Sequence, residues 1–302
     1  MTSYVKDGTV GPWAKEKLDC LERYLIEYTR IMSNQDWCEG FYYVDAFAGS
    51  GMAPLRSYSS TTDNQPSFFE FDEESKSEVT EYVMGSPHIA LGIERPFTKY
   101  FFVDRSNDKT ENLLSLKEEY VGDRAVDIRT DDAENAIREI ISEQDIVAGG
   151  KKRGFVFLDP FGMQVKWNTI ESIARTQSLE VLINFPLDMA IQRMLPKDGS
   201  ISAENRGLLD AYFGTSEWTD HVYDQQTDLF NEPTQKKYGD SSVRLVNWYR
   251  ERLANIFKYT ATPRVILNTR GHPIYYLLFA GPNETGNRIV DHILRQGAKI
   301  RK

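Results

Sequence analysis

Residues 41–51 read FYYVDAFAGSG, an apolar run that stops at an acid and a glycine-rich turn. The run from Phe41 to Phe47 predicts a buried strand. Gly49 and Gly51 predict a tight turn, because glycine adopts backbone conformations that other residues avoid. Backbone amides in such a turn can approach a ligand closely, so this segment is a candidate binding loop. A plain connection between a strand and a helix is the alternative interpretation.

Further apolar runs follow, separated by segments with helical spacing. They predict strands at residues 100–103, 125–128, 155–158 and 179–185. Helices are predicted from Pro12 to Met32, after a Ser86 cap, after Ser106 or Asn107, and from Ala136 to Ile146. Strands that alternate with helices form right-handed βαβ units around a parallel sheet. The predicted fold class is therefore α/β, with a Rossmann-like and mostly parallel sheet.

The last two predicted strands, residues 264–268 and 274–280, are separated only by Gly271, His272 and Pro273. This connection is too short for a crossover helix, so it predicts a C-terminal antiparallel hairpin at the end of the sheet. Residues 1–302 are interpreted as one domain with two insertions. The first is an acidic loop at 56–84, and the second is a helical cap at 187–262, in which Val243 to Phe257 has the clearest helical pattern.

The composition narrows the classes of protein. The chain has 302 residues, 40% of them hydrophobic, and it has no apolar run of about 18 residues and no leader-like N-terminus. A cytoplasmic protein without membrane contact is therefore expected. Cys20 and Cys38 are the only cysteines, which excludes a disulfide framework, and no spacing of His, Cys, Asp and Glu predicts a metal site. His272 and His292 are interpreted as ordinary surface residues.

The charge is distributed unevenly. The net charge is −9, yet residues 1–150 hold 15 Lys and Arg against 29 Asp and Glu, while residues 151–302 hold 21 against 16. A nucleic acid, DNA or RNA, could therefore bind the more basic C-terminal half, with Lys151, Lys152, Arg153 and Arg270 as candidate contacts. A solvated turn is the alternative interpretation of residues 151–153.

Acidic residues follow the predicted strands where open α/β sheets bind ligands. Asp104, after the second strand, could accept two hydrogen bonds from a ribose diol, and Asp131 and Asp132, after the third, could accept from an adenine amino group. Each has an alternative role as a helix cap. The predicted cofactor-binding residues are Asp45, Phe47, Ala48, Gly49, Gly51, Asp104, Arg105, Asp131, Asp132 and Ala133.

The kind of cofactor follows from the motifs that are missing. The third glycine of a dinucleotide fingerprint would fall at Pro54, and no phosphate-binding P-loop motif occurs. These features favour a nucleoside without phosphates. S-adenosylmethionine fits this description, and its sulfonium and ammonium charges suit the acidic half of the chain.

Residues 155–162 read FVFLDPFG, the most specific motif in the chain. Asp159 could accept one hydrogen of an exocyclic amine and the Pro160 carbonyl the other, which would aim the nitrogen lone pair at a methyl group. Phe161 could stack on the base that carries the amine. The predicted catalytic residues are Asp159, Pro160, Phe161 and Gly162. Alternatively, Asp159 and Pro160 only end a strand and Phe161 packs inside.

These motifs resemble those of a known family. DAFAGSG, GSPHIAL, FVFLDPFG with Trp167 after it, LINFP and YYLLFAGPNETGNRIVDHI are similar to segments of the three-Cys-motif partner proteins. The resemblance covers most of the chain and is weakest at 56–82 and 187–240. It implies the fold of class I S-adenosylmethionine-dependent methyltransferases, a cofactor pocket at Asp45 to Gly51 and Asp104, and a radical-enzyme-like partner protein that carries the three-Cys motif.

The DPFG string departs from the D-P-P-Y of amino-adenine methyltransferases at Phe161 and Gly162. It is instead similar to the string of tRNA guanine-N2 dimethyltransferases, which also act on an exocyclic amine. The leading hypothesis is methylation of an exocyclic amine of a nucleic-acid base. The alternatives are a docking partner of the radical-enzyme-like protein with little catalysis of its own, and methylation of a protein or a small molecule.

Overall fold

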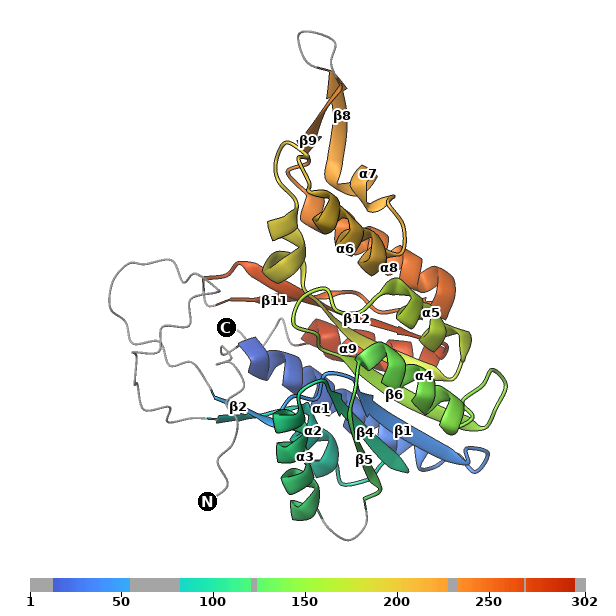
Figure 1. Cartoon of the computed structure of the whole chain (residues 1–302). Coiled ribbons are helices and arrows are strands. Elements are labelled where there is room, and N and C mark those ends of the chain that lie inside the picture. The colour runs from blue at the N-terminus through green and yellow to red at the C-terminus, as the bar shows by residue number, and fades with distance from the viewer. Residues whose placement is uncertain (1–12, 55–81, 121–123, 228–232, 269, 297–302) are drawn as a thin grey trace, which may run out of the picture.

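A central sheet of eight strands forms the frame of the molecule in the computed structural model, which describes residues 13–54, 82–120, 124–227, 233–268 and 270–296 (Figure 1). All seven predicted strands are confirmed. They are β1 (Gly40–Asp45), β4 (Lys99–Asp104), β5 (Val126–Thr130), β6 (Lys152–Leu158), β7 (Leu179–Phe185), β11 (Arg264–Leu267) and β12 (Pro273–Gly281). The eighth strand, β10 (Tyr259–Thr260), is too short to show a period in the sequence.

The strand order explains where a ligand can bind. The order is β5-β4-β1-β6-β7, and all four of these neighbouring pairs are parallel. Numbered along the chain, these strands follow the doubly wound order 3-2-1-4-5, so the order reverses between β1 and β6. Ligands of open α/β sheets bind beyond the carboxyl ends of the strands at this reversal.

The predicted C-terminal hairpin is confirmed at the end of the sheet. Strand β12 pairs antiparallel with β7 on one side and with β10 and β11 on the other. The antiparallel strand is therefore next to the edge, and β10 and β11 form the edge itself.

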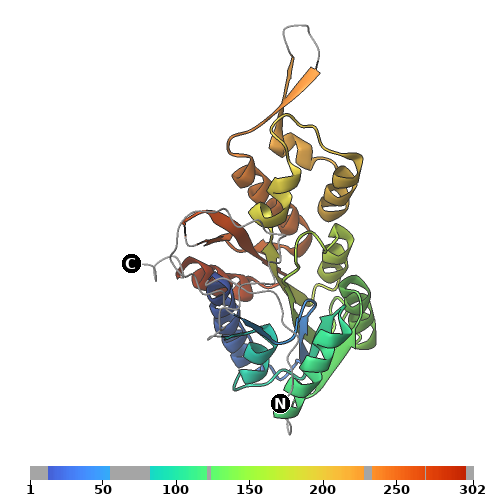
Figure 2. The ribbon, with the colours of Figure 1, turned by 60° about the vertical axis from the view of Figure 1, so that its left-hand side comes forward.

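Helices cover both faces of the sheet (Figure 2). One face packs against α1 (Trp13–Met32), α2 (Ser86–Gly92), α3 (Asn107–Glu119) and α9 (Glu284–Gln296). The other packs against α4 (Ala133–Glu143), α5 (Trp167–Arg175) and α8 (Ser241–Phe257). Strand β7 is buried at every position, as expected for a strand covered on both faces. No helix in the described ranges has the length and apolar character needed to span a membrane.

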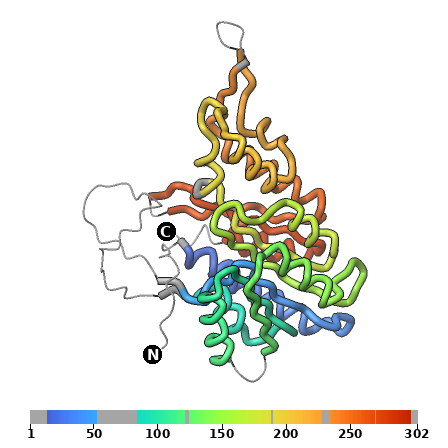
Figure 3. Tube along the Cα trace, in the orientation of Figure 1, coloured from blue at the N-terminus to red at the C-terminus, as the bar shows by residue number. Residues whose placement is uncertain are grey.

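The two insertions differ in part from the prediction. Residues 56–81 of the predicted acidic loop lie outside the described residues, and residues 82–84 form a strand, β3 (Tyr82–Met84), which pairs with β2 (Met52–Pro54). The predicted helical cap contains η1 (Leu187–Ile191), η2 (Gln192–Met194), α6 (Ala203–Phe213), α7 (Trp218–Val222) and α8, together with a hairpin of β8 (Tyr223–Thr227) and β9 (Pro233–Lys237). This hairpin projects from the body (Figure 3) and was missed because its residues are mostly polar.

The cap shares its core with the sheet. The ring of Tyr249 in α8 lies 4.9 Å from that of Phe185 in β7 and 5.4 Å from that of Trp167 in α5. Tyr212 and Phe213 of α6 also pack against Phe185. Buried aromatic contacts therefore join this insertion to the sheet in one hydrophobic core.

Candidate functional site

Three of the predicted acids lie at the carboxyl ends of adjacent strands. Asp45 ends β1, Asp104 ends β4 and Asp159 directly follows β6. Strand β1 pairs with β4 on one side and with β6 on the other, and Asp45 is in register with Phe102 and Phe157. The structure therefore brings these three carboxylates to one edge of the sheet, beside the reversal of strand order.

Asp45 is fully buried behind the glycine turn. Its carboxylate accepts hydrogen bonds from the Phe47 amide at 3.3 Å, the Tyr43 hydroxyl at 3.3 Å and the Ser86 hydroxyl. Burial raises the pKa of Asp45 to about 7, and the negative charge of Asp159 adds to the rise. Ser86 is the first residue of α2, which is capped by Gly85, so the prediction that Ser86 caps this helix is wrong.

Asp104 joins the glycine turn to α3. Its Oδ2 accepts the Gly49 amide at 3.2 Å and lies 3.6 Å from the Lys109 ammonium, while Oδ1 accepts the Ser106 amide at 2.9 Å. Gly49 and Gly51 have φ angles of 63° and 84°, which confirms the turn that the sequence predicted. The cap of α3 is Ser106, so Asp104 bonds the capping residue and is not the cap itself, and its role toward a ribose diol stays a prediction.

The remaining predicted cofactor residues surround this turn. The Ala48 amide bonds to the Val103 carbonyl, so the loop is anchored to β4. Asp132 caps α4 through the Glu134 amide at 2.9 Å and pairs with Arg105, and Asp131 accepts the Asp132 amide at 2.7 Å. Ala133 begins α4 and is buried. The capping alternative therefore holds for Asp132, whose carboxylate is already engaged by two partners.

Asp159 is held by two residues that the sequence did not indicate. Its Oδ2 forms an ion pair with Lys17 of α1, and its Oδ1 accepts a 2.7 Å hydrogen bond from the amide nitrogen of Asn184, at the end of β7. A carboxylate only accepts, so the Asn184 nitrogen must face it, and the Asn184 oxygen has no partner among the described residues. Asn184 lies in the quoted LINFP segment, and its place at a strand end was the available signal.

Phe161 projects from the same loop into solvent. Its side chain is 70% exposed, so the alternative in which it packs inside is wrong. The Lys109 ammonium lies 5.7 Å from the centre of its ring, a cation–π contact. Pro160 before it is buried, and Gly162 after it has a φ of 83°, which turns the chain sharply. An exposed aromatic ring beside Asp159 can stack on a planar ligand.

Three of the four basic residues proposed as nucleic-acid contacts lie at the opposite edge of the sheet. Lys151, Lys152 and Arg153 precede or begin β6, at the end of the strand opposite to Asp159. Lys151 pairs with Glu39 at 3.0 Å, and Arg153 lies over the ring of Trp37. Arg270 differs, because it is exposed in the turn between β11 and β12, which lies beyond the carboxyl end of β7. The structure therefore does not bring residues 151–153 to the acidic edge.

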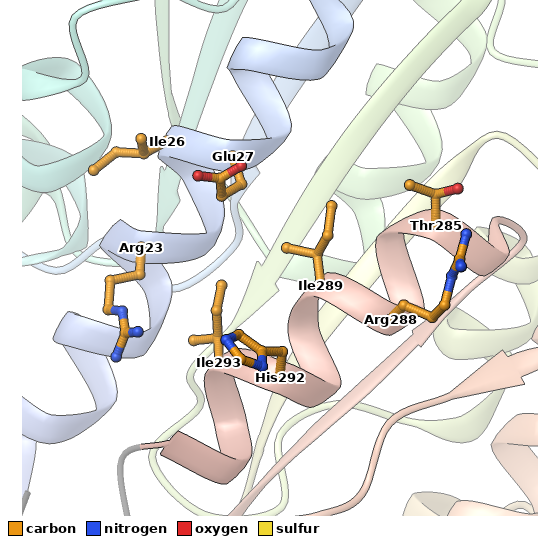
Figure 4. A pocket seen from close by; sticks show the side chains of 8 residues that line it. All are labelled: Arg23, Ile26, Glu27, Thr285, Arg288, Ile289, His292 and Ile293. Carbon is orange, nitrogen blue, oxygen red and sulfur yellow. The ribbon is translucent and has the colours of Figure 1, made fainter.

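A separate groove runs between α1 and α9 (Figure 4). It has a volume of about 590 Å³ and is lined by Arg23, Ile26, Glu27, Thr285, Arg288, Ile289, His292 and Ile293. None of the predicted catalytic or cofactor-binding residues lines it. The candidate functional site is therefore the carboxyl edge of the sheet, where the strand order reverses and the acidic residues meet.

No family model and no curated protein matches this chain. Among solved structures, the chain is similar to the crystal structure of protein LPL1258 from Legionella pneumophila, which has the family-model name DUF519. The two chains share 12% sequence identity with a TM-score of 0.50, over 92% of this chain and 91% of that chain. At this level of identity the likeness shows the fold alone, and it extends over nearly the whole α/β body.

Proposed function

We propose that this protein is an S-adenosylmethionine-dependent methyltransferase that acts on an exocyclic amine of a nucleic-acid base. One observation carries the proposal: Asp159 lies beside the exposed Phe161 and close enough to the buried Asp45 to raise its pKa. An acceptor carboxylate, a stacking ring and a second carboxylate are thus grouped where the sheet reverses its order.

The residues at this edge suit a cationic nucleoside. The charges of Asp45 and Asp159 oppose one another, and a cation bound nearby would relieve this repulsion. The Asp104 carboxylate lies against the Gly49 amide and can accept from ribose hydroxyls, as an acid after the second strand does in nucleotide sites. Asp45, Asp104 and the turn at Gly49 and Gly51 would therefore hold the cofactor.

The bound cofactor supplies a methyl group on a sulfonium. The protein has to orient an amine whose lone pair is delocalised into the base. Asp159 accepts one amine hydrogen and the Pro160 carbonyl the other, so that the nitrogen lone pair points at the methyl carbon, while Phe161 stacks on the base. The proton leaves the nitrogen afterwards, to water or to Asp159.

Calorimetric titration with S-adenosylmethionine tests the cofactor site. Asp104→Ala is expected to weaken binding roughly 10- to 100-fold, since a hydrogen bond to a charged group is lost. Asp108→Ala, an exposed acid in the first turn of α3, is the matched control and should leave binding unchanged. If the full chain releases no heat, or if both variants bind like wild type, the cofactor assignment is wrong.

Methyl transfer is tested with labelled S-adenosylmethionine and total RNA or denatured DNA, followed by mass spectrometry of the nucleosides. Label is expected on the amino group of adenine, cytosine or guanine, and poly(U) should accept none because uracil has no amino group. Asp159→Ala and Asp159→Asn should lower kcat roughly 10²- to 10³-fold. Label on a ring atom or a ribose, or variants with full rates, would refute the mechanism.

Binding of the cofactor without transfer to any nucleic acid would instead support one of the other functions. The first is a docking role towards a protein with a three-Cys motif, which the family resemblance implies. The second is methylation of a protein or a small molecule. Copurification without transfer favours docking, and turnover that hardly responds to salt favours a small molecule.

A further inference from the structure

Lys17 reaches the strand ends from outside the sheet. It lies in the second turn of α1, its side chain is only 10% exposed, and its ammonium pairs with Asp159 Oδ2. The two residues are 142 positions apart in the chain. A largely buried ion pair costs desolvation of both charges, so it contributes little net stability.

Asn184 fixes the other side of the same carboxylate. The register of β6 and β7 pairs Leu158 with Ile183, which sets Asp159 beside Asn184, and the amide nitrogen donates to Oδ1 at 2.7 Å. Asn184 is 4% exposed, so its own position is fixed by packing. The two carboxylate oxygens together offer about four lone-pair positions, and Lys17 and Asn184 use two of them. Asp159 therefore keeps acceptor capacity while its orientation is set.

Polar and charged groups from three elements surround Asp159. Among the described residues, Lys17 of α1 and Asn184 of β7 bond to it, and Asp45 and Tyr43 of β1 face it electrostatically. The Lys17 ammonium and the Asn184 amide are both donors, so they hold the carboxylate by its two oxygens. The remaining acceptor positions of the carboxylate can face an amine hydrogen.

We propose that Lys17 is a positioning residue of the methyl-transfer site, which together with Asn184 holds the Asp159 carboxylate in its orientation. This inference rests on the proposed function, because it assumes that Asp159 accepts a hydrogen bond from the amine to be methylated. It makes helix α1 a part of the active site, although no predicted site residue lies on that helix. Lys17 itself takes no part in bond making or breaking.

Steady-state kinetics of methyl transfer test the proposal with Lys17→Met, Lys17→Arg and the control Lys15→Met, an exposed lysine on the same helix. Lys17→Met is expected to lower kcat roughly tenfold and to leave the KM for the acceptor within about threefold of wild type, because a misoriented carboxylate costs transition-state stabilisation and not binding. Lys17→Arg should restore most of kcat, and Lys15→Met should change neither constant. The Kd for S-adenosylmethionine should stay within about threefold of wild type in each variant, since the change is confined to the acceptor side.

A second measurement needs no turnover. Denaturant unfolding of Lys17→Met, Asp159→Asn and the double variant forms a thermodynamic cycle. The double variant is expected to unfold at a higher denaturant midpoint than Lys17→Met alone, because that single variant leaves a buried charge without its partner. Strictly additive midpoints would show that the two residues are not coupled and would overturn the inference.

The kinetic outcomes separate the inference from the proposed function. If wild type binds the cofactor but methylates no amine, both fail. If wild type transfers and Lys17→Met matches it, or is faster because the lysine obstructs the acceptor, only the inference fails. A Lys17→Met variant that raises KM as much as it lowers kcat, and whose rate arginine does not restore, would show a merely structural role and overturn the inference. If Lys17→Met does not fold, Asn184→Asp is used, and an unchanged kcat there overturns the inference.

Discussion

Asp45 is the residue at which burial and function are most directly linked. The side chain has no exposure, and its carboxylate accepts three hydrogen bonds from neighbouring residues. These bonds stabilise the charged form, yet burial outweighs them and raises the pKa from 3.8 to about 7. The protein therefore holds a carboxyl group that changes charge near neutral pH directly behind the candidate binding turn.

Cofactor binding should depend on pH because of Asp45. A bound cation favours the ionised carboxylate, so below pH 7 binding must release the Asp45 proton. The Kd for S-adenosylmethionine is expected to rise as the pH falls from 7 to about 5.5, approaching tenfold per pH unit. Calorimetry over this range checks the slope, and the Asp45→Asn variant should bind the cofactor more weakly and with little pH dependence. A variant that keeps the wild-type slope would show that another group titrates.

At the scale of elements, the packing of α1 and α9 on the sheet contains a buried acid. Glu180 of β7 is 6% exposed and accepts a hydrogen bond from the Tyr24 hydroxyl of α1. Gly286 of α9 gives it room, because a Cβ there would lie 2.4 Å from Oε1 of Glu180. Burial raises the pKa of Glu180 to about 7. Helices α1 and α9 and strand β7 therefore enclose one ionisable group, the Glu180 carboxyl.

The raised pKa of Glu180 predicts the direction in which stability changes with pH. The folded pKa lies above the ordinary value of 4.5, so the native state binds the proton more tightly, and stability falls as pH rises from about 4.5 to 7. Glu180→Gln keeps an acceptor for Tyr24 and removes the charge. It should therefore raise Tm relative to wild type at pH 8 and leave it nearly unchanged at pH 5. Glu22→Gln, at an exposed position on α1, is the control. An unchanged Tm of the Glu180→Gln variant at pH 8 would contradict the burial of a charge at this position.

At the scale of the whole molecule, the distribution of basic residues decides where a polyanion can lie. The net charge is −9, and residues 151–153 face away from the acidic edge. Arg105 and Lys166 lie at the carboxyl edge instead, after β4 and before α5, and are 71% and 59% exposed. Their partners are Asp132 and Glu134, so both cations are present beside the candidate site.

Binding of single-stranded nucleic acid should therefore show a small dependence on salt, with contributions from this edge. Arg105→Ala and Lys166→Ala are each expected to reduce the slope of log K against log salt by about one. Lys151→Ala, at the far end of β6, is the matched control and should leave the slope unchanged. Fluorescence anisotropy of a labelled oligonucleotide over a salt series measures this. A reduced slope in Lys151→Ala alone would place the nucleic acid at the opposite edge.

The sequence by itself determined the strands, their parallel arrangement and the group of acids at their ends. It could do so because a strand buried on both faces must be continuously apolar, and because carboxyl ends of parallel strands meet at one edge. Asp45, Asp104 and Asp159 were found this way. The polar hairpin of β8 and β9 was missed, since hydrophobic periodicity carries no information about exposed polar strands.

Only the tertiary structure decided which residues touch these acids. Lys17 is 142 positions from Asp159, and nothing in the local pattern of an amphipathic helix marks one lysine as buried. The exposure of Phe161 and the place of residues 151–153 at the far edge also depend on how the chain folds back on itself. Local spacing fixes elements, whereas contacts between distant elements follow from packing, which a single sequence does not display.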